Sequence, residues 1–309
     1  VGVSDNIRNI KDQINKISVS ESRIFINGPT GSGKELIARK IHKESKRQKG
    51  PFIILNGALL DIKKYELELF GEEKENGSII YGALEKSSRG TLLIDEISEI
   101  PLDTQSKILR VLIDQKFKRI NGNHDINVDV RIICSSSKDI KKEIENGNFR
   151  EDLYHRLNVF EINIEPLKNR VSDIPLLVEY FSEKISKNYN LKRLSIDSNN
   201  DYLLTYDWPG NVRELRNLIE RIAILSPDTP NKISNIIKES LKTPDIKNIS
   251  SENSLSIPLK EARENFEKEY LTTQLKKFNG NISKTADFIG MERSALHRKL
   301  KGLGIKELN

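Results

Sequence analysis

The stretch RIFINGPTGSGKELIARKI, Arg23 to Ile41, decides the fold because three kinds of local structure follow one another in it. Its first residues are mostly β-branched or aromatic, its middle is rich in glycine, and its end places Leu36, Ile37 and Ile41 at helical spacing. This order predicts a strand, a loop and a helix. We therefore expect an α/β fold in which the loop joins a buried strand to an amphipathic helix.

The loop between Gly28 and Lys34 matches the phosphate-binding pattern, in which glycines let backbone N–H groups surround phosphate oxygens at a helix N-terminus. Lys34 is expected to reach the β and γ phosphates. The pattern continues with Ser or Thr for Mg²⁺, whereas this chain has Glu35, so the metal must depend on another carboxylate or on water. An incidental glycine-rich turn is the alternative, but the flanking strand and helix patterns argue against it. The predicted nucleotide-binding residues of this loop are Gly28, Pro29, Thr30, Gly31, Ser32, Gly33, Lys34 and Glu35.

A second pattern, GTLLIDE from Gly90 to Glu96, is typical of a buried strand that ends in two adjacent acids. We expect Asp95 to hold Mg²⁺ through water and Glu96 to orient and deprotonate an attacking water. Adjacent acids at a strand end also occur merely as solubilising groups. Their position downstream of a phosphate loop favours a nucleotide site, with ATP as the ligand and ATP hydrolysis as the activity.

The composition limits the classes of protein to which the chain can belong. Its 309 residues, 36% of them hydrophobic, are enough for two or three globular units. Cys134 is the only cysteine, which excludes an internal disulfide framework and a Cys-rich metal site and indicates a reducing cytoplasm. No apolar run approaches the about 18 residues of a membrane span, so no membrane contact is expected. The net charge of +6 mildly favours a polyanionic partner, although solvated surface charge gives the same value.

The C-terminal part of the chain has a different character. Residues Thr243 to Pro258 read TPDIKNISSENSLSIP and predict a flexible tether. The run LKEARENFEKEYLTTQLKKF that follows predicts a long amphipathic helix suited to dimerisation. The runs ISKTADFIG and ERSALHRKLKGLG, separated by a turn at Gly290–Met291, have the spacing of a helix-turn-helix. The apolar stripe of the long helix consists of Leu259, Ala262, Phe266, Tyr270, Leu271 and Leu275.

With these motifs the chain resembles the bacterial enhancer-binding regulators, AAA+ ATPases that work with sigma-54 RNA polymerase. The resemblance covers nearly the whole chain, and in that family the phosphate loop is typically followed by Glu, as it is here. It implies an α/β AAA+ P-loop NTPase with a parallel sheet flanked by helices, a small all-α lid and a C-terminal all-α helix-turn-helix domain of the Fis type. The expected boundaries are residues 1–165 for the nucleotide-binding subdomain, 166–242 for the lid, 243–257 for the linker and 258–309 for the DNA-binding domain.

The resemblance also implies roles for residues that their patterns alone do not single out. PFIILNGA resembles the strand that bears the switch asparagine of the family, here Asn56, which couples Glu96 to the nucleotide state. FREDLYHRLNVF resembles the segment that supplies arginine fingers to the ATP of a neighbouring subunit, so Arg150 and Arg156 are the candidates and a homo-oligomer, a dimer or a hexameric ring, is implied. WPGNVREL resembles the lid motif in which Arg213 senses the γ-phosphate.

The likeness to Fis-type domains implies that the second helix of the helix-turn-helix enters the major groove of double-stranded DNA. Arg293 and Arg298 are expected to read base edges, and His297 is expected to assist them. The alternative is a basic three-helix bundle that only packs against the ATPase. The residues expected to contact phosphates are Lys284, Ser294, Lys299 and Lys301.

Two departures from the family pattern bear on activity. After the strand VRIIC the family carries Thr-Asn as a sensor near the γ-phosphate, whereas this chain has Ser136–Ser137, which predicts firm ATP binding but slow turnover. At residues 71–85 working sigma-54 activators carry a Gly-Ala-Phe-Thr-Gly-Ala loop, whereas this chain reads GEEKENGSIIYGALE. We interpret this stretch as a remnant that does not contact the sigma factor.

The second departure is shared with the NtrX group of nitrogen-related response regulators. Members of that group carry an N-terminal receiver that is phosphorylated by a sensor histidine kinase of the NtrY type. A chain that begins at Val1 rather than Met, without such a receiver, fits a piece of a longer protein of this kind. The resemblance therefore implies an upstream sensor kinase as a partner.

The sequence as a whole predicts a bacterial, cytoplasmic, ATP-binding response regulator that acts by occupying DNA. The alternative is an active ATP-driven enzyme that remodels sigma-54 polymerase and uses Ile79 to Tyr81 as an unorthodox loop tip. A third class, a nucleotide-gated assembly protein without a DNA role, predicts weak DNA binding that does not respond to salt.

Overall fold

The computed structural model describes residues 1–58, 62–188, 194, 196–225, 230–241, 267–268, 271–272, 274–275, 278 and 281–303. The chain divides into two compact units, Val1–Leu241 and Lys242–Asn309. The predicted tether and much of the predicted long helix, including Leu259, Ala262, Phe266 and Tyr270 of its apolar stripe, lie outside the described residues. Among the helices of the described ranges, none has the length and apolar character needed to cross a membrane.

A five-stranded parallel sheet forms the centre of the first unit, as the strand and helix patterns predict. Its order is β2-β5-β8-β1-β9, so β1 lies between β8 and β9, and the first three residues of β1, Ile24 to Ile26, are buried. Such burial on both faces is typical of a parallel strand covered by helices. The strands are β1 (Ile24–Asn27), β2 (Phe52–Asn56), β5 (Thr91–Asp95), β8 (Arg131–Ser136) and β9 (Phe160–Asn163).

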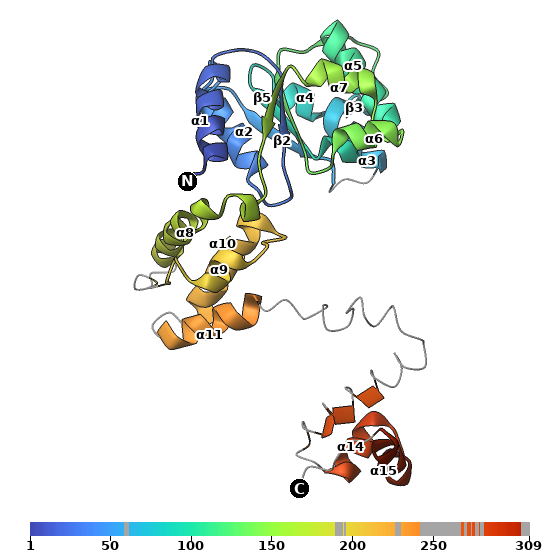
Figure 1. Ribbon diagram of the computed structural model, residues 1–309. Coiled ribbons are helices and arrows are strands. Elements are labelled where there is room, and N and C mark those ends of the chain that lie inside the picture. Colours follow the sequence, from blue (N-terminus) through green and yellow to red (C-terminus); the bar gives the residue numbers. More distant parts are fainter. Residues whose placement is uncertain are drawn as a thin grey trace. The chain divides into compact units, whose positions relative to one another are not determined.

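Helices cover both faces of this sheet (Figure 1). On one face, α1 (Asp5–Ile17) and α2 (Lys34–Lys43) pack against alternate strand residues that include Ile24 and Ile26. On the other face, Phe25 and its neighbours pack against a second set of helices. This set comprises α3 (Ile62–Phe70), α4 (Ala83–Lys86), α5 (Leu102–Asp114), α6 (Ile140–Glu145) and α7 (Glu151–Leu157).

Helix α2 begins at Lys34, as the sequence predicts, but not every apolar residue at helical spacing lies on its buried face. Leu36 is 70% exposed, whereas Ala38 and Ile41 are fully buried. Lys34 is itself buried, and positions 34, 38 and 41 share one face of a helix. Because that face lies against the sheet, position 36 turns away from it, whereas Ile37 packs against the core beside Ile41.

Two short antiparallel hairpins lie outside the main sheet. One is formed by β3 (Gly71–Glu73) and β4 (Ile79–Tyr81), and the other by β6 (Lys116–Phe117) and β7 (Ile126–Asn127). A turn of 3-10 helix, η1 (Ile97–Glu99), follows β5 directly. The first hairpin therefore lies in residues 71–85, where working sigma-54 activators carry the Gly-Ala-Phe-Thr-Gly-Ala loop.

The last part of the first unit is helical and has its own core. Trp208 is buried in this core, and its indole Nε1 donates a hydrogen bond of 2.9 Å to the carbonyl of Leu203. The segment begins with two 3-10 turns, η2 (Leu167–Asn169) and η3 (Val171–Asp173). Its helices are α8 (Ile174–Asn188), α9 (Asp201–Thr205), α10 (Asn211–Leu225) and α11 (Pro230–Leu241).

The second unit contains the two helices of the predicted helix-turn-helix, α14 (Ile282–Ile289) and α15 (Arg293–Gly302). Their small core includes Leu271 and Leu275, which belong to the predicted long helix. The other core residues are Ala286, Leu296 and Leu300. This packing leaves one face of α15 to the polar and basic residues between the leucines.

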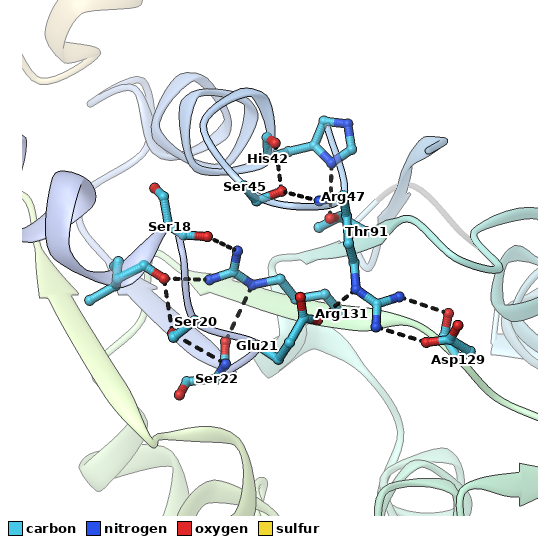
Figure 2. Close-up of polar contacts among 11 residues, drawn as sticks. Ser18, Ser20, Glu21, Ser22, His42, Ser45, Arg47, Thr91, Asp129 and Arg131 are labelled. Carbon is cyan, nitrogen blue, oxygen red and sulfur yellow. Dashed lines mark hydrogen bonds and ion pairs between the residues drawn. The ribbon is translucent and has the colours of Figure 1, made fainter. Parts of the chain in front are cut away.

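At the N-terminal end of β8, the buried Arg131 joins the sheet to the end of α1 (Figure 2). It is only 1% exposed, and its Nη1 and Nη2 atoms each donate a 2.9 Å hydrogen bond, to the carbonyls of Ser18 and Ile17 respectively. These carbonyls end a helix, where the helix dipole favours a positive charge. Burial lowers the pKa of the Arg131 guanidinium, and the charge of Glu21 opposes this effect.

Replacing Arg131 by Met should lower the free energy of unfolding by about 2–4 kcal/mol, because buried carbonyls would lose their donors. Chemical denaturation followed by circular dichroism measures this change. The matched control is Arg47→Met, which removes partly exposed ion pairs to Glu21 (2.6 Å) and Asp129 (2.7 Å). The control should cost about 1 kcal/mol or less. Equal losses in the two variants would contradict the special role of Arg131.

Candidate functional site

The C-terminal ends of the parallel strands meet at one edge of the sheet, and the predicted loop and acids lie there together. β2 pairs with β5 so that Asn56 stands opposite Asp95. The loop that follows β1 joins the same edge, since the N–H of Gly28 donates a 3.2 Å hydrogen bond to the carbonyl of Ser136 at the end of β8. Parallel strands present ligands at this edge in open α/β folds.

Lys34 connects the glycine loop to the acids at the end of β5. Its ammonium Nζ lies 3.0 Å from Glu96 Oε1 and donates a 2.8 Å hydrogen bond to the carbonyl of Gly28. The Lys34 side chain is 6% exposed and that of Glu96 is 14% exposed, so this ion pair is largely shielded from water. A shielded ammonium at the start of a helix is a strong attractor for phosphate oxygens.

Glu96 is held from two sides. Its Oε2 accepts hydrogen bonds from the backbone N–H of Ser137 (2.8 Å) and from the Ser137 hydroxyl (2.7 Å), while its Oε1 faces Lys34. Burial alone would raise the pKa of the Glu96 carboxyl, but the hydrogen bonds from Ser137 and Lys34 outweigh this effect and hold the pKa below its ordinary value. Glu96 is therefore ionised at neutral pH.

Asp95 has different partners from Glu96. Its Oδ2 accepts a 3.1 Å hydrogen bond from the Asn56 amide, and its Oδ1 accepts a hydrogen bond from the Ser135 hydroxyl. The carbonyl oxygen of the Asn56 amide accepts a 2.9 Å hydrogen bond from the N–H of Ala58. Asn56 thus contacts Asp95 in this structure, whereas Glu96 contacts Ser137 and Lys34.

The glycine loop has the features of a phosphate cradle. Gly31 and Gly33 have φ angles of +77° and +109°, which residues with a Cβ rarely adopt, and a Cβ on Gly31 would lie 2.2 Å from the carbonyl of Gly210. The Ser32 hydroxyl is buried and has no hydrogen-bond partner within the described part of the chain. Buried hydroxyls are normally paired, so this group fits an additional acceptor such as a phosphate oxygen. Glu35 lies apart from this cradle, with its carboxylate 2.7 Å from Arg39 Nε.

Residues of the helical segment close over the loop, and sequence reasoning missed two of them. The Asn211 amide nitrogen donates to the carbonyl of Thr30 (3.0 Å), and Arg170 Nη2 donates to the carbonyl of Ser32 (3.2 Å). The backbone N–H of Arg213 donates to the carbonyl of Gly31 (3.3 Å), while the Arg213 side chain is exposed. A positive φ of 51° at Asn211 agrees with the turn expected there, but nothing in the sequence indicates that its amide contacts the loop.

A cavity of about 500 Å³ lies beside Arg170, and sequence reasoning missed it too. Arg170 lines the cavity and also contacts the glycine loop, so the two features are neighbours. Asp173 holds the wall of the cavity together, because its buried carboxylate accepts hydrogen bonds from the N–H groups of Val3 (2.6 Å) and Ser4 (2.8 Å) and lies 3.5 Å from Arg170 Nη1. The lining residues are Val3, Ser4, Asp5, Asn6, Glu165, Asn169, Arg170, Val171 and Ser172.

The candidate finger residues Arg150 and Arg156 make their contacts elsewhere, on α5 and at the start of α7. Arg150 Nη2 lies 2.6 Å from Asp152, and its Nη1 donates to the Ser106 hydroxyl at 3.1 Å. Arg156 is exposed and donates from Nη2 to the carbonyl of Leu112 at 3.4 Å. Neither contact is to the glycine loop of the same chain.

The candidate DNA-binding residues lie on α14 and α15. Most of them are exposed, but Lys299 is partly buried. Its ammonium lies 2.9 Å from the carboxylate of Glu267. Arg293 is the first residue of α15, where side chains of a recognition helix reach bases. The side chain of Lys301 lies outside the described residues. The exposed members of the set are Lys284, Arg293, Ser294, His297 and Arg298.

Three family models match consecutive parts of the chain. The sigma-54 interaction domain matches residues 1–163, the AAA+ ATPase lid domain matches residues 168–252, and the Fis family of bacterial regulatory proteins matches residues 262–303. The succession of the three models follows the order of the sheet, the helical segment and the C-terminal helices.

Several proteins are similar over nearly the whole chain. The nitrogen assimilation regulatory protein NtrX of Azorhizobium caulinodans is 45% identical over 99% of this chain and 69% of its own length. An NtrX-like response regulator of Rickettsia typhi is 47% identical over 96% of this chain and 64% of its own length. The crystal structure of NtrX from Brucella abortus in complex with ATP is also similar, with a TM-score of 0.76. The two sequences are 44% identical, and the match covers 98% of this chain and 69% of the Brucella chain. The chain thus spans about two thirds of the length of these relatives.

Proposed function

The chain belongs to the bacterial enhancer-binding AAA+ regulators with a sigma-54 interaction domain, and is NtrX-like; from this premise we propose that it binds ATP and occupies DNA without remodelling sigma-54 polymerase. It is a transcriptional regulator with a helix-turn-helix domain of the Fis type. The single observation that supports the nucleotide site best is the shielded Lys34–Glu96 pair beside the glycine loop, at 3.0 Å.

Lys34 is neutralised by Glu96 in this structure. A triphosphate would offer stronger, multiple acceptors to the Lys34 ammonium, to the loop N–H groups and to the Ser32 hydroxyl. The cavity beside Arg170 has room for the nucleoside part of ATP. The ATP and ADP complexes solved for NtrX of Brucella abortus support this reading.

Mg²⁺, when bound with ATP, neutralises charge on the β and γ phosphates. The residue that would hold it through water is Asp95, whose carboxylate is oriented by Asn56 and Ser135. Glu96 would accept the proton of the attacking water. Arg150 and Arg156 would reach the nucleotide of a neighbouring subunit in a homo-oligomer, and Arg213 would approach the γ-phosphate of its own.

The β3–β4 hairpin is the feature that speaks against remodelling of sigma-54 polymerase by this chain. Its tip, residues 74–78, reads KENGS and is closed by hydrogen bonds between Lys74 and Ser78 (2.9 Å) and between Gly77 and Lys74 (2.8 Å). This tip is short and polar, and it has neither an aromatic residue nor a threonine to insert into a partner. The alternative, that the chain remodels sigma-54 polymerase, depends on the exposed side chains of Ile79 and Tyr81 as the contact with the polymerase. These side chains are 43% and 54% exposed.

Arg119 ties the hairpin to its surroundings, which further limits the movement that remodelling needs. Its guanidinium donates to Glu85 from Nε (2.8 Å) and Nη2 (2.6 Å) and to Glu73 from Nη1 (2.7 Å), and it lies over the ring of Tyr81. A bidentate contact of this kind is geometrically restrictive. Arg119 thus joins both strands of the hairpin, at Glu73 and Tyr81, to Glu85 of α4.

Transcription with sigma-54 polymerase tests the proposal. The full-length protein, supplied with ATP at a sigma-54 promoter that carries its binding site, should produce no open complexes detectable by permanganate footprinting. An activator with the Gly-Ala-Phe-Thr-Gly-Ala loop, given its own site on the same promoter, is the positive control. ATP-dependent open complexes with this protein would overturn the proposal in favour of the remodelling alternative.

DNA occupancy would depend on α15. Arg293 and Arg298 are proposed to read base edges, with His297 beside them, and Lys284, Ser294, Lys299 and Lys301 to contact phosphates. For Lys299 this requires exchange of its Glu267 partner for a phosphate. We also propose domain boundaries at residues 165, 242 and 257, and an upstream receiver addressed by a sensor histidine kinase. The third alternative, an assembly protein without a DNA role, would show weak, salt-insensitive DNA binding.

A further inference from the structure

The buried amide of Gln105, on α5, holds two stretches of backbone that are distant in the chain. Its Nε2 donates hydrogen bonds to the carbonyls of Ile100 (2.8 Å) and Asn148 (3.0 Å). Its Oε1 accepts a hydrogen bond of 2.9 Å from the backbone N–H of Arg150. Because two carbonyls face the amide nitrogen and an N–H faces the amide oxygen, the partners fix the orientation of the amide.

The two stretches belong to different parts of the nucleotide-binding subdomain. Ile100 closes the 3-10 turn that begins after Glu96. Asn148 and Arg150 lie on either side of the buried Phe149, directly before α7, and residues 148–150 are called here the finger segment. One side chain therefore joins the turn after the acids to the finger segment.

Helix α5 is also the surface on which both candidate finger residues rest. It packs beside α7 (Figure 1). The Arg150 side chain, which is 41% exposed, donates to the Ser106 hydroxyl, and Arg156 donates to the carbonyl of Leu112. Ser106 follows Gln105 directly, so α5 contacts the backbone of Arg150 from the interior and its side chain from the surface.

A buried amide at position 105 has a cost that an apolar residue would avoid. Transfer of an amide from water to the protein interior is unfavourable unless hydrogen bonds replace those to water. Gln105 makes three such bonds, all of them to backbone groups. Its buried neighbour Thr104 faces Glu66 of α3 instead, at 3.4 Å. The amide of Gln105 is thus directed at the finger segment, whereas the hydroxyl of Thr104 is directed at α3.

We propose that Gln105 is a positioning residue for ATP hydrolysis in the neighbouring subunit, because it fixes the backbone from which Arg150 extends. The inference rests on the proposed function, in which Arg150 reaches the nucleotide of that neighbour. A misplacement of about 1 Å in such a group can cost about 100-fold in rate. The chain's own site is held by other contacts, since Glu96 pairs with Lys34 and Ser137. Loss of the Gln105 amide should therefore impair a subunit as a supplier of Arg150 and spare its own site.

The reaction that this arrangement serves takes place at the nucleotide of the neighbouring subunit. The oxygen of a water molecule bonds to the γ-phosphorus, the bond from that phosphorus to the β,γ-bridging oxygen breaks, and ADP leaves. One proton of the water passes to Glu96 of the neighbouring subunit. The guanidinium of Arg150 keeps its protons and offsets the charge that grows on the phosphoryl oxygens.

The experiment mixes variants of the full chain in pairs and measures phosphate release. Arg150→Ala keeps its own site but lacks the finger, so it is the recipient. Glu96→Gln binds ATP without hydrolysing it, so it is the donor of Arg150. Each variant alone should turn over slowly, and the mixture should recover turnover at the sites of the recipient. A donor that carries both Glu96→Gln and Gln105→Met should rescue at least about tenfold less turnover.

The converse mixture shows which subunit is impaired. Gln105→Met with an intact Glu96, used as the recipient beside the Glu96→Gln donor, should keep turnover within about threefold of the Arg150→Ala recipient. A merely structural role of the amide would lower donor and recipient activity together, so equal losses would overturn the inference. Undiminished rescue by the double variant would overturn it as well.

The matched control is Thr104→Val in the same donor, because Thr104 is also buried on α5 but faces α3. Its rescue should stay within about twofold. Thermal unfolding shows whether each variant is folded. If Gln105→Met unfolds below the assay temperature, Gln105→Asn, which keeps an amide one methylene shorter, replaces it with the same expected loss. Failure of the simple Glu96→Gln donor to rescue Arg150→Ala would overturn the proposed finger role of Arg150, and the inference with it.

Discussion

Lys34→Ala should abolish measurable ATP binding, with an affinity loss of roughly 100-fold or more, because a shielded ammonium contributes several kcal/mol to a charge contact. The Lys34 side chain is 6% exposed and stands between the carbonyl of Gly28 and Glu96. Phosphate oxygens that replace Glu96 would therefore meet a cation that water screens weakly. Titration with a fluorescent ATP analogue or isothermal calorimetry measures the loss.

The matched control for this prediction is Lys43→Ala. Lys43 is the last residue of the same helix and is exposed, so its removal should leave the affinity within about twofold. Thermal unfolding of both variants shows whether the fold is intact, since Lys34→Ala also leaves Glu96 without its cation. Unchanged nucleotide affinity in a folded Lys34→Ala protein would show that the glycine loop is not the phosphate site.

Glu96→Gln should bind ATP and fail to hydrolyse it, with kcat reduced about 100-fold or more, because an amide cannot accept the proton of the attacking water. Nucleotide affinity should be equal or slightly higher, since the amide no longer competes with phosphates for the Lys34 ammonium at 3.0 Å. Phosphate release and nucleotide titration, performed on the same preparation, separate the two effects.

Glu99→Gln is the control for this second prediction. Glu99 lies three residues farther along the chain, and its carboxylate is 2.9 Å from the ammonium of Lys138 rather than at the loop. Its replacement should leave kcat within about twofold. Normal turnover in Glu96→Gln would mean that another group is the base, and Asp95, the adjacent carboxylate at the end of β5, would then be the first to replace.

Much of the fold could be predicted because its decisive features are local. The β-branched run before Gly28 and the helical spacing after Gly33 predict a strand and a helix, and these appear as β1 and α2. Leu36 shows the limit of such reasoning. Helical spacing indicates which residues share a face but not which face meets the sheet, and in the structure the face with Lys34, Ala38 and Ile41 does so.

The candidate site could be predicted only where one short motif contains the chemistry. The glycine loop and the adjacent acids are such motifs, and both lie at the same sheet edge. Arg170 and Asn211 were beyond sequence reasoning as contacts of this site, and for Ser137 only its place near the γ-phosphate was implied, not its hydrogen bonds to Glu96. Each is an ordinary polar residue in its own segment, and each reaches the loop or Glu96 across a large separation in the chain.

The sequence by itself determined the strand, loop and helix around Gly28 to Lys34, the acids that end β5 and the order of the ATPase, lid and helix-turn-helix parts. The strand, loop, helix and acids follow from composition and spacing within short windows, whereas the order of the three parts follows from the family resemblance. Only the tertiary structure decided that Glu96 is shared between Lys34 and Ser137, and that the lid contacts the loop through Asn211. The physical reason is that such contacts arise from strand order and register, which place residues distant in the chain within hydrogen-bonding reach.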